Sequence, residues 1–490
     1  MNFEFLNSPI SLGYYYLLAI YYIFIFSLAI KILLEQKDPA KTIGYILLLI
    51  FVPIFGLLVY QLFGINLRKQ KLFNRKALTD QKNMRAFLDQ NNQLFYKDEK
   101  ELENLVGSGA KLAKLLINSD NANLTKYNKI ELIENGENVF PKMLQEIEKA
   151  EHFIHMEFYK IANDITGNKF FEAIKKKAKQ GVEVRLIYDD VGSIDINNRL
   201  RSELEQNNIM AYPFMPVRFP RFTSRINYRD HRKILIIDGK MAFMGGINLR
   251  DAYDNSIKKP LFWKDLSFKL EGEALYRVQL LFFLNWYFVS NQMLEFSNKY
   301  FKPNSLKALC PAQIIASGPD SDWPSIMQAI LESINAAKKS VKICTPYFVP
   351  NASIVSAIIN TALSGVDVQI LLPTNPDSRV AKAVSISYLG ELLDAGVKIY
   401  MYTKGMMHAK YLCVDEAFCT IGSANIDIRS FEYNFEINTV IYDTKTTKSL
   451  VNIFESDKQN SYLLTKEQWN NRPFRKKLAQ GFMRIVAPLL

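Results

Sequence analysis

Two stretches of the chain repeat the same set of reactive side chains at the same spacing. The first runs from His231 to Asn248 and the second from His408 to Asn425. Both follow the pattern His-x-Lys-x4-Asp-x6-Gly-[Gly/Ser]-x-Asn, and because the chain has only 4 histidines, half of them belong to this pattern. The matched positions are His231, Lys233, Asp238, Gly245, Gly246 and Asn248 in the first copy, and His408, Lys410, Asp415, Gly422, Ser423 and Asn425 in the second. A single histidine is usually structural, but six constrained positions that recur together indicate a shared chemical task.

This combination of groups suits the transfer of a phosphoryl group. Lysine neutralises nonbridging phosphate oxygens, and an asparagine amide adds a fixed donor. One neutral histidine can attack phosphorus and form a covalent phosphohistidine. The other histidine, when protonated, can give its proton to the leaving alkoxide and then act as base for an incoming alcohol. No metal and no cofactor is expected, because the lysines would supply the charge and His-x-Lys is not a metal-ligand spacing.

Each imidazole also needs a carboxylate that orients its ring. Glu436 lies on the expected strand that follows the second copy, in YNFEINTV, and Asp265 has the comparable position after the first copy, in FWKDLSFKL. Both are predicted to orient the histidines. His152 and His155 lie outside the pattern and are expected to be structural. The four cysteines, which show no metal-type pairing and no disulfide framework, are also expected to be structural; they are Cys310, Cys344, Cys413 and Cys419.

The elements that carry the two copies are predicted to be buried strands. KILIID and KYLCVD are apolar runs of strand length. A histidine and a lysine two residues apart on such a strand point to the same face. Asp238 and Asp415 belong to the catalytic pattern, but they fall at the strand ends, where holding local structure is the simpler role.

The surrounding sequence is duplicated as well. Residues 140–159 and 323–348 each read as a helix followed by a strand, and further strands are expected from Gly181 and Gly365 and from Asn207 and Ala395. The two copies lie too far apart for a solenoid, so we expect two fused α/β domains related by a pseudo-twofold axis that brings the histidines face to face. The predicted bounds are 126–295 for the first domain, 296–320 for a junction and 321–470 for the second domain.

The N-terminal part predicts a membrane hairpin. Residues 5–30 and 42–67 contain no charged side chain, and about 20 residues suffice to cross a bilayer as a helix. We expect spans over 11–30 and 43–63 within a segment 1–68, with a kink at Pro53 and Gly56. A cleaved signal peptide fits poorly, because no basic region precedes the first apolar run. The basic linker 69–125 would keep the following domains in the cytoplasm of a bacterial cell, at its inner membrane.

The net charge of +12 points to an anionic partner, which can be nucleic acid, a phospholipid surface or a phosphorylated substrate. The basic stretch 217–233 is interpreted as an exposed lip that touches lipid headgroups, with a structural loop as the alternative. The basic and apolar tail 471–490 either lies on the membrane as an amphipathic helix or packs against the protein. The apolar run from Leu280 to Phe288 is expected in the core.

The paired motif resembles that of the phospholipase D superfamily, whose members use a phosphohistidine intermediate. Within it, the chain is similar to bacterial cardiolipin synthases with two N-terminal spans, through TIGYILLLIFVPIFGLLVYQLFG, IHMEFY, NYRDHRKILIIDG, IGSANIDIRSFEYNFEIN and the terminal RIVAPLL. Such enzymes condense two phosphatidylglycerol molecules into cardiolipin and release glycerol. The resemblance implies His231, Lys233, His408 and Lys410 as catalytic groups, Asn248, Asn425 and Ser423 as phosphate ligands, and His231 as the nucleophile. The chain departs from the pattern at GGINLRDAY in the first copy and at Asn285, where an acidic residue is expected.

Three other functions remain open from the sequence. A hydrolase that releases phosphatidic acid would use the same residues, because pocket shape and dryness choose the acceptor. The predicted hairpin favours the transferase, whose two substrates are both lipids. A membrane-tethered nuclease is disfavoured because no nucleic-acid module is recognisable, and an inactive scaffold is disfavoured because both motifs are intact. The expected partners are phosphatidylglycerol and anionic membrane lipid, with no nucleic acid, and oligomerisation is left open.

Overall fold

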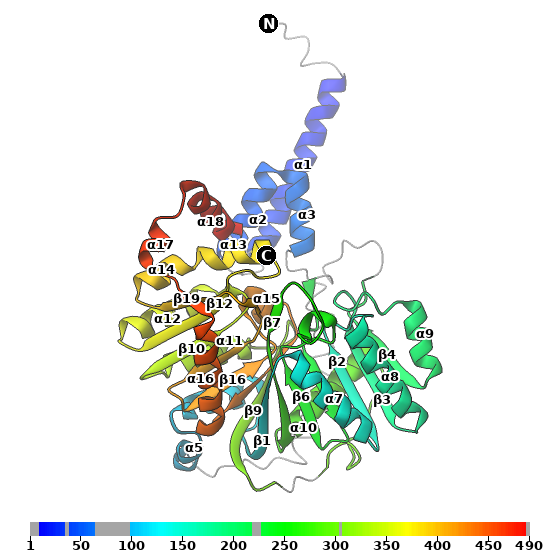
Figure 1. Ribbon diagram of the computed structural model, residues 1–490. Helices are drawn as coiled ribbons and strands as arrows, with labels where there is room; N and C mark the ends of the chain where they lie inside the picture. The colour runs from blue at the N-terminus through cyan, green and yellow to red at the C-terminus, as the bar shows by residue number, and fades with distance from the viewer. Residues whose placement is uncertain (1–8, 35–38, 64–98, 218–226, 303–305, 487–490) are drawn as a thin grey trace. The chain divides into compact units, whose positions relative to one another are not determined.

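The computed structural model describes residues 9–34, 39–63, 99–217, 227–302 and 306–486 (Figure 1). The chain divides into a small N-terminal unit within Met1–Gln70 and a large unit that contains most of the remaining chain.

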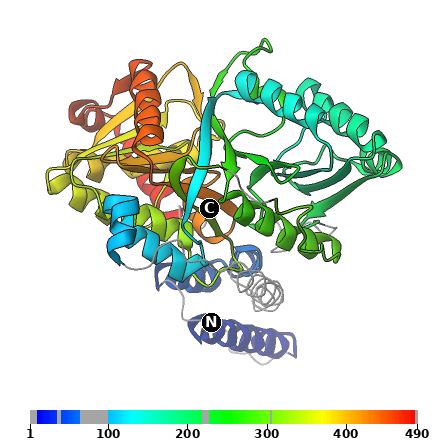
Figure 2. The ribbon, with the colours of Figure 1, turned by 90° about the horizontal axis from the view of Figure 1, so that it is seen from below.

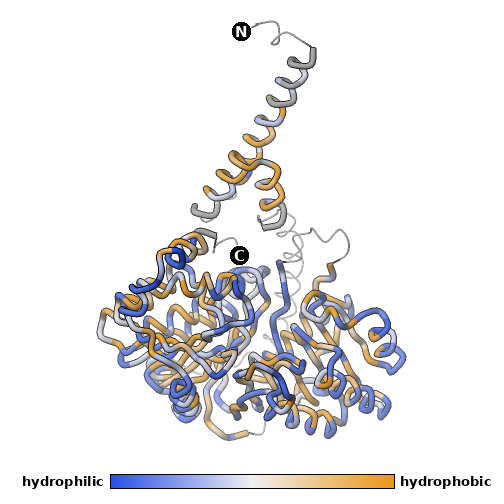
Figure 3. Tube along the Cα trace, turned by 45° about the horizontal axis from the view of Figure 1, so that its top comes forward, coloured by the Kyte–Doolittle hydropathy of each residue, from blue (hydrophilic) through white to orange (hydrophobic). Residues whose placement is uncertain are grey.

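The small unit consists of three helices, α1 (Pro9–Leu34), α2 (Pro39–Phe51) and α3 (Pro53–Phe63). One helix, α2, ends at Phe51 and the next, α3, begins at Pro53, where the kink was predicted. A proline has no backbone N–H to continue the hydrogen bonds of a preceding helix. Among the described side chains of this unit only a few are buried, including Ile25 and Leu49, and α2 and α3 are largely hydrophobic (Figure 3). Within the described part of the chain, no helix combines the length and the apolar character that crossing a membrane requires. The predicted spans 11–30 and 43–63 are therefore not confirmed.

The large unit is built on one sheet of 15 strands, in the order β19-β13-β12-β10-β15-β16-β18-β9-β1-β8-β6-β5-β2-β3-β4. The order of the first half, read outward from β1, matches the order of the second half, read outward from β9. The two halves join where β1 pairs antiparallel with β9, Thr125 opposite Ala312. In Figure 2, β1 is the long cyan strand that runs between the two halves. This arrangement confirms the two fused α/β domains.

The corresponding strands of the two halves pair in the same way. Strands β2, β3 and β4 of the first half are parallel, as are β10, β12 and β13 of the second, and in each half the strand that follows the histidine runs antiparallel to them. The second half has one more edge strand, β19, which pairs antiparallel with β13. The strands of the first half are β1 (Thr125–Glu134), β2 (Phe153–Phe158), β3 (Glu183–Asp189), β4 (Ile209–Phe214), β5 (Lys233–Ile237), β6 (Met241–Gly245) and β8 (Leu266–Gly272). Those of the second half are β9 (Leu309–Ser317), β10 (Ser340–Cys344), β12 (Asp367–Pro373), β13 (Lys398–Tyr402), β15 (Tyr411–Val414), β16 (Phe418–Gly422), β18 (Glu436–Ile441) and β19 (Ser461–Leu463).

Helices cover both faces of the sheet. Along β5, Ile234 and Ile236 face one apolar cluster while Leu235 and Ile237 face another, because successive strand side chains alternate. The first cluster spans both halves and lies under α10 (Leu275–Ser290) and α16 (Thr444–Gln459). Residues 280–286 of α10 are buried, which confirms the core position predicted for that part of the run. The opposite face is covered by α7 (Gly136–Lys149) and α8 (Ile165–Lys179) in the first half, and by α6 (Ala110–Asp120), α11 (Ser325–Asn335) and α12 (Ala352–Leu363) in the second.

Several elements lie in segments for which the sequence predicted no helix or strand. The helices α5 (Glu99–Val106) and α6 fall in the predicted linker 69–125, and β9 falls in the predicted junction 296–320. The large unit also contains the helices α9 (Asn198–Gln206), α13 (Arg379–Ser387), α14 (Leu389–Asp394) and α15 (Ile428–Glu432). The tail forms α17 (Lys466–Asn470) and α18 (Phe474–Val486), and α18 packs against α13. All four cysteines are free and buried, as expected.

Candidate active site

Two short backbone bridges between the halves create the site. The strand β14 (Gly405–Met407) pairs parallel with β7 (Phe262–Lys264), and the N–H of His408 donates to the carbonyl oxygen of Lys264 at 2.7 Å. In the matching place, an isolated bridge joins Asp230 to Phe435, and the N–H of His231 donates to the carbonyl oxygen of Phe435 at 2.9 Å. Each histidine therefore precedes its own strand, β5 or β15, and lies against the residue before the orienting carboxylate of the other half.

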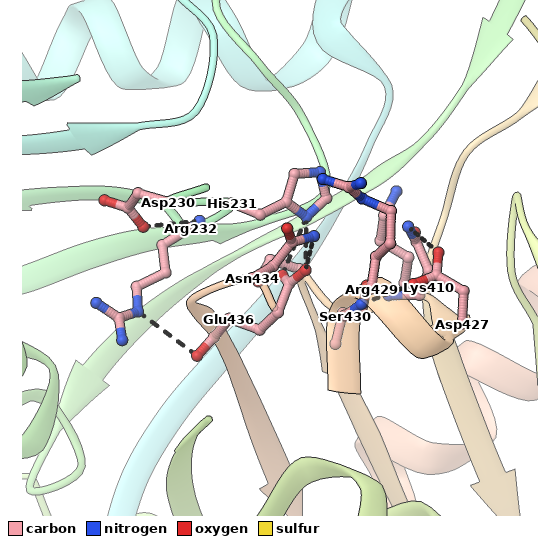
Figure 4. A network of polar contacts seen from close by, with 12 residues as sticks. Asp230, His231, Arg232, Lys410, Asp427, Arg429, Ser430, Asn434 and Glu436 are labelled. Atoms are coloured by element: carbon pink, nitrogen blue, oxygen red, sulfur yellow. Dashed lines mark hydrogen bonds and ion pairs between the residues drawn. The ribbon is translucent and has the colours of Figure 1, made fainter. Parts of the chain in front are cut away.

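The two carboxylates are exchanged between the halves as a result. The Nδ1 atom of His231 lies 2.9 and 3.0 Å from the carboxylate oxygens of Glu436, and the Nδ1 atom of His408 lies 2.6 Å from Asp265. The carboxylate of Glu436 also accepts from Ser423 at 2.5 Å. It accepts from Asn434 at 3.2 Å as well, and Figure 4 shows Asn434 and Glu436 beside His231. Burial opposes the charged form of Glu436, yet its attraction to His231 and the hydrogen bonds it accepts keep its pKa below the ordinary value.

Both imidazoles line one cavity of about 490 Å³. Since Nδ1 of each ring is held by a carboxylate, Nε2 is the atom left for chemistry in the cavity. Aromatic rings fix the imidazoles further: Tyr159 meets His231 edge-on at 5.0 Å, and Tyr253 and Trp263 lie 5.5 and 5.3 Å from the ring of His408. Burial lowers the pKa of both histidines, that of His408 to about 4, so both imidazoles are neutral near pH 7.

The motif lysines are buried against the histidines that they accompany. The Nζ atom of Lys233 donates to the carbonyl oxygen of His231 at 2.5 Å, and Lys410 donates to the carbonyl oxygen of His408. Neither lysine is among the residues that line the cavity. Burial lowers the pKa of Lys410, and it lowers that of Lys233 to about 7, so a bound phosphate anion would restore a full charge on both.

Of the three expected phosphate ligands, two line the cavity. These are Asn248 and Asn425, and the buried Oδ1 atom of Asn425 has no hydrogen-bond partner within the described residues. Ser423 does not line the cavity, because its hydroxyl is turned toward Glu436. We therefore assign Ser423 a positioning role in place of phosphate binding.

The motif aspartates lie away from the histidines, at the far ends of their strands. The carboxylate of Asp238 accepts from the backbone N–H groups of Glu151, His152 and Phe153 at 2.8–2.9 Å. That of Asp415 accepts in the same way from residues 338–340 at 2.7–2.8 Å. Neither aspartate lines the cavity, so their inclusion in the catalytic pattern is corrected to a structural role: Asp238 clamps the loop that leads into β2, and Asp415 clamps the loop that leads into β10.

Of the two histidines outside the motif, His155 has the structural position that was expected. His155 is fully buried, stacks on Phe282 at 4.4 Å and shares a hydrogen bond with Gln279 at 2.9 Å. Its burial lowers its pKa well below the ordinary value, so it remains neutral. His152 is exposed at the start of β2.

The basic stretch 217–233 differs from the expected exposed lip where it is described. Residues 218–226 lie outside the described residues. Beyond them, Arg229 and Arg232 are buried and form ion pairs at 3.2 Å with Asp189 and Glu157. Asn285, which replaces the expected acid, donates to the same Glu157 at 2.7 Å. These arginines therefore hold the segment that leads into His231, since unpaired charges could not be buried there.

Sequence reasoning missed four cationic side chains on the wall of the cavity, Lys160, Arg229, Arg250 and Arg429. The departure of GGINLRDAY from GSANIDIRS was the available signal for Arg250, which follows the motif asparagine by two residues. No group of three or more His, Cys, Asp or Glu side chains that could hold a metal occurs among the described residues. The positive charge that faces the cavity comes from arginine and lysine.

This fold and this site define a class: a two-domain protein of the phospholipase D type, in which paired His-x-Lys motifs share one phosphoryl-transfer pocket. Comparisons with known proteins narrow the class. A family described as "Cardiolipin synthase, PLD-like domain" matches residues 143–255 and 330–458, and a family described as "Phospholipase_D-nuclease N-terminal" matches residues 20–64.

Named relatives match almost the whole chain. This chain is 36% identical over 471 residues to cardiolipin synthase 2 of Bacillus anthracis, and the match covers 95% of this chain and 90% of the relative. It is 37% identical over 465 residues to cardiolipin synthase of Geobacillus kaustophilus, covering 94% and 91%. The crystal structure of phosphatidylserine synthase from Haemophilus influenzae shares the fold, with a TM-score of 0.60 at 17% identity over 78% of this chain and all of that one. The chain belongs to the cardiolipin synthase family.

Proposed function

We propose that this protein is a phosphatidyltransferase that condenses two phosphatidylglycerol molecules into cardiolipin and releases glycerol. The observation that carries the proposal is the pair of imidazoles on one cavity, each held at Nδ1 by a buried carboxylate of the other half. That geometry suits a two-step transfer with one nucleophile and one proton carrier.

In the first step, Nε2 of His231 attacks the phosphorus of the donor lipid. An N–P bond forms, the P–O bond to the headgroup glycerol breaks, and His408 gives its Nε2 proton to the departing glycerol oxygen. In the second step, a headgroup hydroxyl of another phosphatidylglycerol loses its proton to His408 and attacks the phosphorus. The N–P bond then breaks, and both histidines return to their starting states.

The charge requirements of these steps match the site. His231 must be neutral to attack, and its lowered pKa provides this form. His408 must carry a proton, and the anionic phosphodiester would raise its pKa when it enters the buried cavity. The two asparagine side chains and the motif lysines would then stabilise the negative charge that gathers on the phosphoryl oxygens.

We propose also that the protein works at the cytoplasmic membrane. Many apolar side chains of the N-terminal helices are exposed, among them Ile23, Phe26 and Ile54. On α18, Phe474, Leu478 and Phe482 form an exposed apolar ridge at helical spacing, next to the basic side chains of residues 475–477. The ion pair of Arg484 with Glu391 fixes this helix to the large unit, so the ridge can rest on an anionic lipid surface.

A spin label would test the membrane contact of α18. L478C, labelled in the full-length protein in vesicles that contain phosphatidylglycerol, should be accessible to oxygen and protected from a water-soluble relaxation agent. The matched label E467C should show the reverse. Equal exposure of both labels to the water-soluble agent would remove α18 from the membrane contact.

The lipid reaction itself is tested by a product assay. Full-length protein in detergent is given labelled phosphatidylglycerol with EDTA present, and the products are separated. Cardiolipin together with free glycerol would support the transferase, whereas phosphatidic acid alone would identify a hydrolase that admits water to the site. H231A protein that forms cardiolipin at the normal rate would contradict the phosphohistidine route.

A further inference from the structure

The two halves present different side chains to the cavity at matching positions. The bridge between Ile161 and Leu249 in the first half matches the pairing of Phe348 with Ile426 in the second, because Leu249 and Ile426 each follow the motif asparagine. The flanking residues therefore correspond as well. Lys160 matches Tyr347, and Arg250 matches Asp427.

The first half therefore presents two cations to the cavity at positions where the second half presents none. All four of these residues line the cavity. The first half contributes an ammonium and a guanidinium, and the second half contributes a phenol and a carboxylate. The hydroxyl of Tyr347 is engaged with Asp377, and the carboxylate of Asp427 accepts from Asn425 at 2.9 Å and from the N–H of Ser430 at 2.7 Å.

The charges of Lys160 and Arg250 are not compensated by an ion pair. Neither side chain lies within salt-bridge distance of a carboxylate in the part of the chain that the structure describes. The Nε atom of Arg250 is buried without a hydrogen-bond partner among the described residues. The nearby carboxylate of Asp164 is already used, because it accepts from the N–H groups of Gly167 and Asp251 at 2.9 and 2.8 Å.

The other two cavity arginines have partners. Arg229 is paired with Asp189 at 3.2 Å, and Arg429 donates to the carbonyl oxygen of Asn227 at 3.4 Å. Lys160 and Arg250 are held next to each other by backbone, since the N–H of Lys160 donates to the Asn248 side chain at 3.2 Å and the N–H of Leu249 donates to the carbonyl oxygen of Lys160 at 3.1 Å. They thus form a fixed cationic pair beside, and separate from, the histidines.

The proposed reaction requires a place for a second phosphate. When the phosphatidyl group is on the histidine, the acceptor lipid must put its glycerol hydroxyl at the phosphorus. Its own phosphodiester, at the other end of that glycerol, then lies inside the cavity a few bonds away. An anion bound beside the buried histidines needs a cation that no protein carboxylate already holds.

We propose that Lys160 and Arg250 form the subsite for the phosphodiester of the acceptor lipid; this rests on the proposed function. The subsite accounts for a preference for a lipid acceptor over water or glycerol, because neither of these carries an anion to bind there. The guanidinium suits a phosphodiester through its paired donors, and the ammonium adds a point charge.

Isotope exchange separates acceptor binding from the first chemical step. With the same donor, phosphatidylglycerol, three acceptors are compared: a second phosphatidylglycerol, sn-glycerol 3-phosphate, and labelled glycerol, which exchanges into the lipid. K160A, R250A and the double variant should lose about 10- to 100-fold in cardiolipin formation, the scale of a charge-assisted hydrogen bond. Glycerol exchange should stay within about 2-fold of wild type. Transfer to glycerol 3-phosphate should fall with cardiolipin formation if phosphate is what the pair recognises.

Matched controls decide the outcome. K149A removes an exposed lysine of α7 that does not line the cavity and should leave all three rates unchanged. The exchanged pair K160R/R250K should recover most of the cardiolipin rate. Equal losses with all three acceptors, or no loss with any, would overturn the subsite. A wild-type protein that makes no cardiolipin would instead refute the proposed function.

Discussion

The two halves of the large unit hold their histidines with different carboxylates, and the difference extends to the residues behind them. Glu436 accepts from His231 and is also held by the side chains of Ser423 and Asn434. Asp265 is one methylene shorter, and besides His408 it accepts from the N–H of Leu266 at 2.8 Å. Where the second half has Ser423, the first has Gly246, and a Cβ atom there would lie 2.2 Å from a carboxylate oxygen of Asp265.

A duplicated motif therefore need not give two equivalent catalytic groups. The pKa of both imidazoles is lowered by burial, but that of His408 reaches about 4, with the neighbouring Lys410 as a further cause. The cationic pair Lys160 and Arg250 has no counterpart in the second half. Such asymmetry allows one histidine to attack while the other carries the proton, within a fold that is close to symmetric.

The largest expected effect separates the roles of the two histidines. H231A and H408A should each lower cardiolipin formation by at least about 10⁴-fold, because the two groups act as a unit. A phosphatidyl ester of p-nitrophenol needs no acid for its departure. With that substrate, H408A should still release a burst of nitrophenol while H231A should not. A burst from H231A alone would reverse the assignment.

The motif lysines come next in expected size. K233A and K410A should each lose ~3–4 kcal/mol of transition-state stabilisation, which is the scale of losing a donor to a developing oxyanion, and kcat/KM should fall accordingly. Steady-state rates with phosphatidylglycerol in mixed micelles measure this loss. Both lysines donate to the carbonyl oxygens of their histidines. Near-normal rates in both variants would show that neither lysine engages the phosphate.

The two positions behind the carboxylates should differ in the same assay. G246A places a methyl group against Asp265 and should lower kcat about 10²-fold, since a shift of about 1 Å in a catalytic group has that effect. S423A removes one of several donors to Glu436 and should lower kcat only about 10-fold. Thermal unfolding of both variants checks that the fold is intact. A larger loss in S423A than in G246A would contradict the packing argument.

The pH dependence gives the smallest effect and concerns Lys233. Its pKa of about 7 means that kcat/KM should fall above about pH 7, where the free enzyme loses this charge. Stability should move in the opposite direction. From about 7 up to the unfolded value near 10.4 the unfolded chain binds more protons than the folded one, so this group makes folding more favourable as pH rises.

The variant K233M checks both statements. It should be more stable than wild type by about 1–2 kcal/mol at pH 6, because it removes a charge that is buried without a carboxylate partner in the described structure. It should also lack the alkaline limb near pH 7 in its residual activity. A variant that is less stable than wild type would show that Lys233 contributes favourably to the empty fold.

Much of the fold could be predicted from the sequence, because both halves repeat local patterns. The strands β2, β3 and β4 and their counterparts β10, β12 and β13 form where apolar runs predicted them, and buried runs follow both histidines. Glu436 and Asp265 could be chosen by their place after each motif. Which histidine each one serves could not, because that depends on two bridges between segments far apart in the chain.

The remaining misses have related causes. Composition indicated a basic exposed lip, but the carboxylates that pair with Arg229 and Arg232 lie on β3 and β2, remote in sequence. Ser423 occupies a motif position, yet the chain turns its hydroxyl toward Glu436 and away from the cavity. Lys160 gives no local signal at all, since only the bridge beside Leu249 brings it to the cavity.

One feature of the fold sets the order in which the chain can finish folding on the ribosome. The helices α5 and α6 precede the first half in sequence, but their apolar side chains, such as Leu112 and Leu116, pack in the core of the second half, against α11. The side-chain amide of Gln313 on β9 donates to the carbonyl oxygen of Ala113 in the first turn of α6 at 3.1 Å and to that of Ala122, just beyond the helix, at 2.7 Å. These helices emerge early and stay without their partner surface until β9 and α11 have been synthesised, so the core of the second half can be completed only after the whole first half has been made.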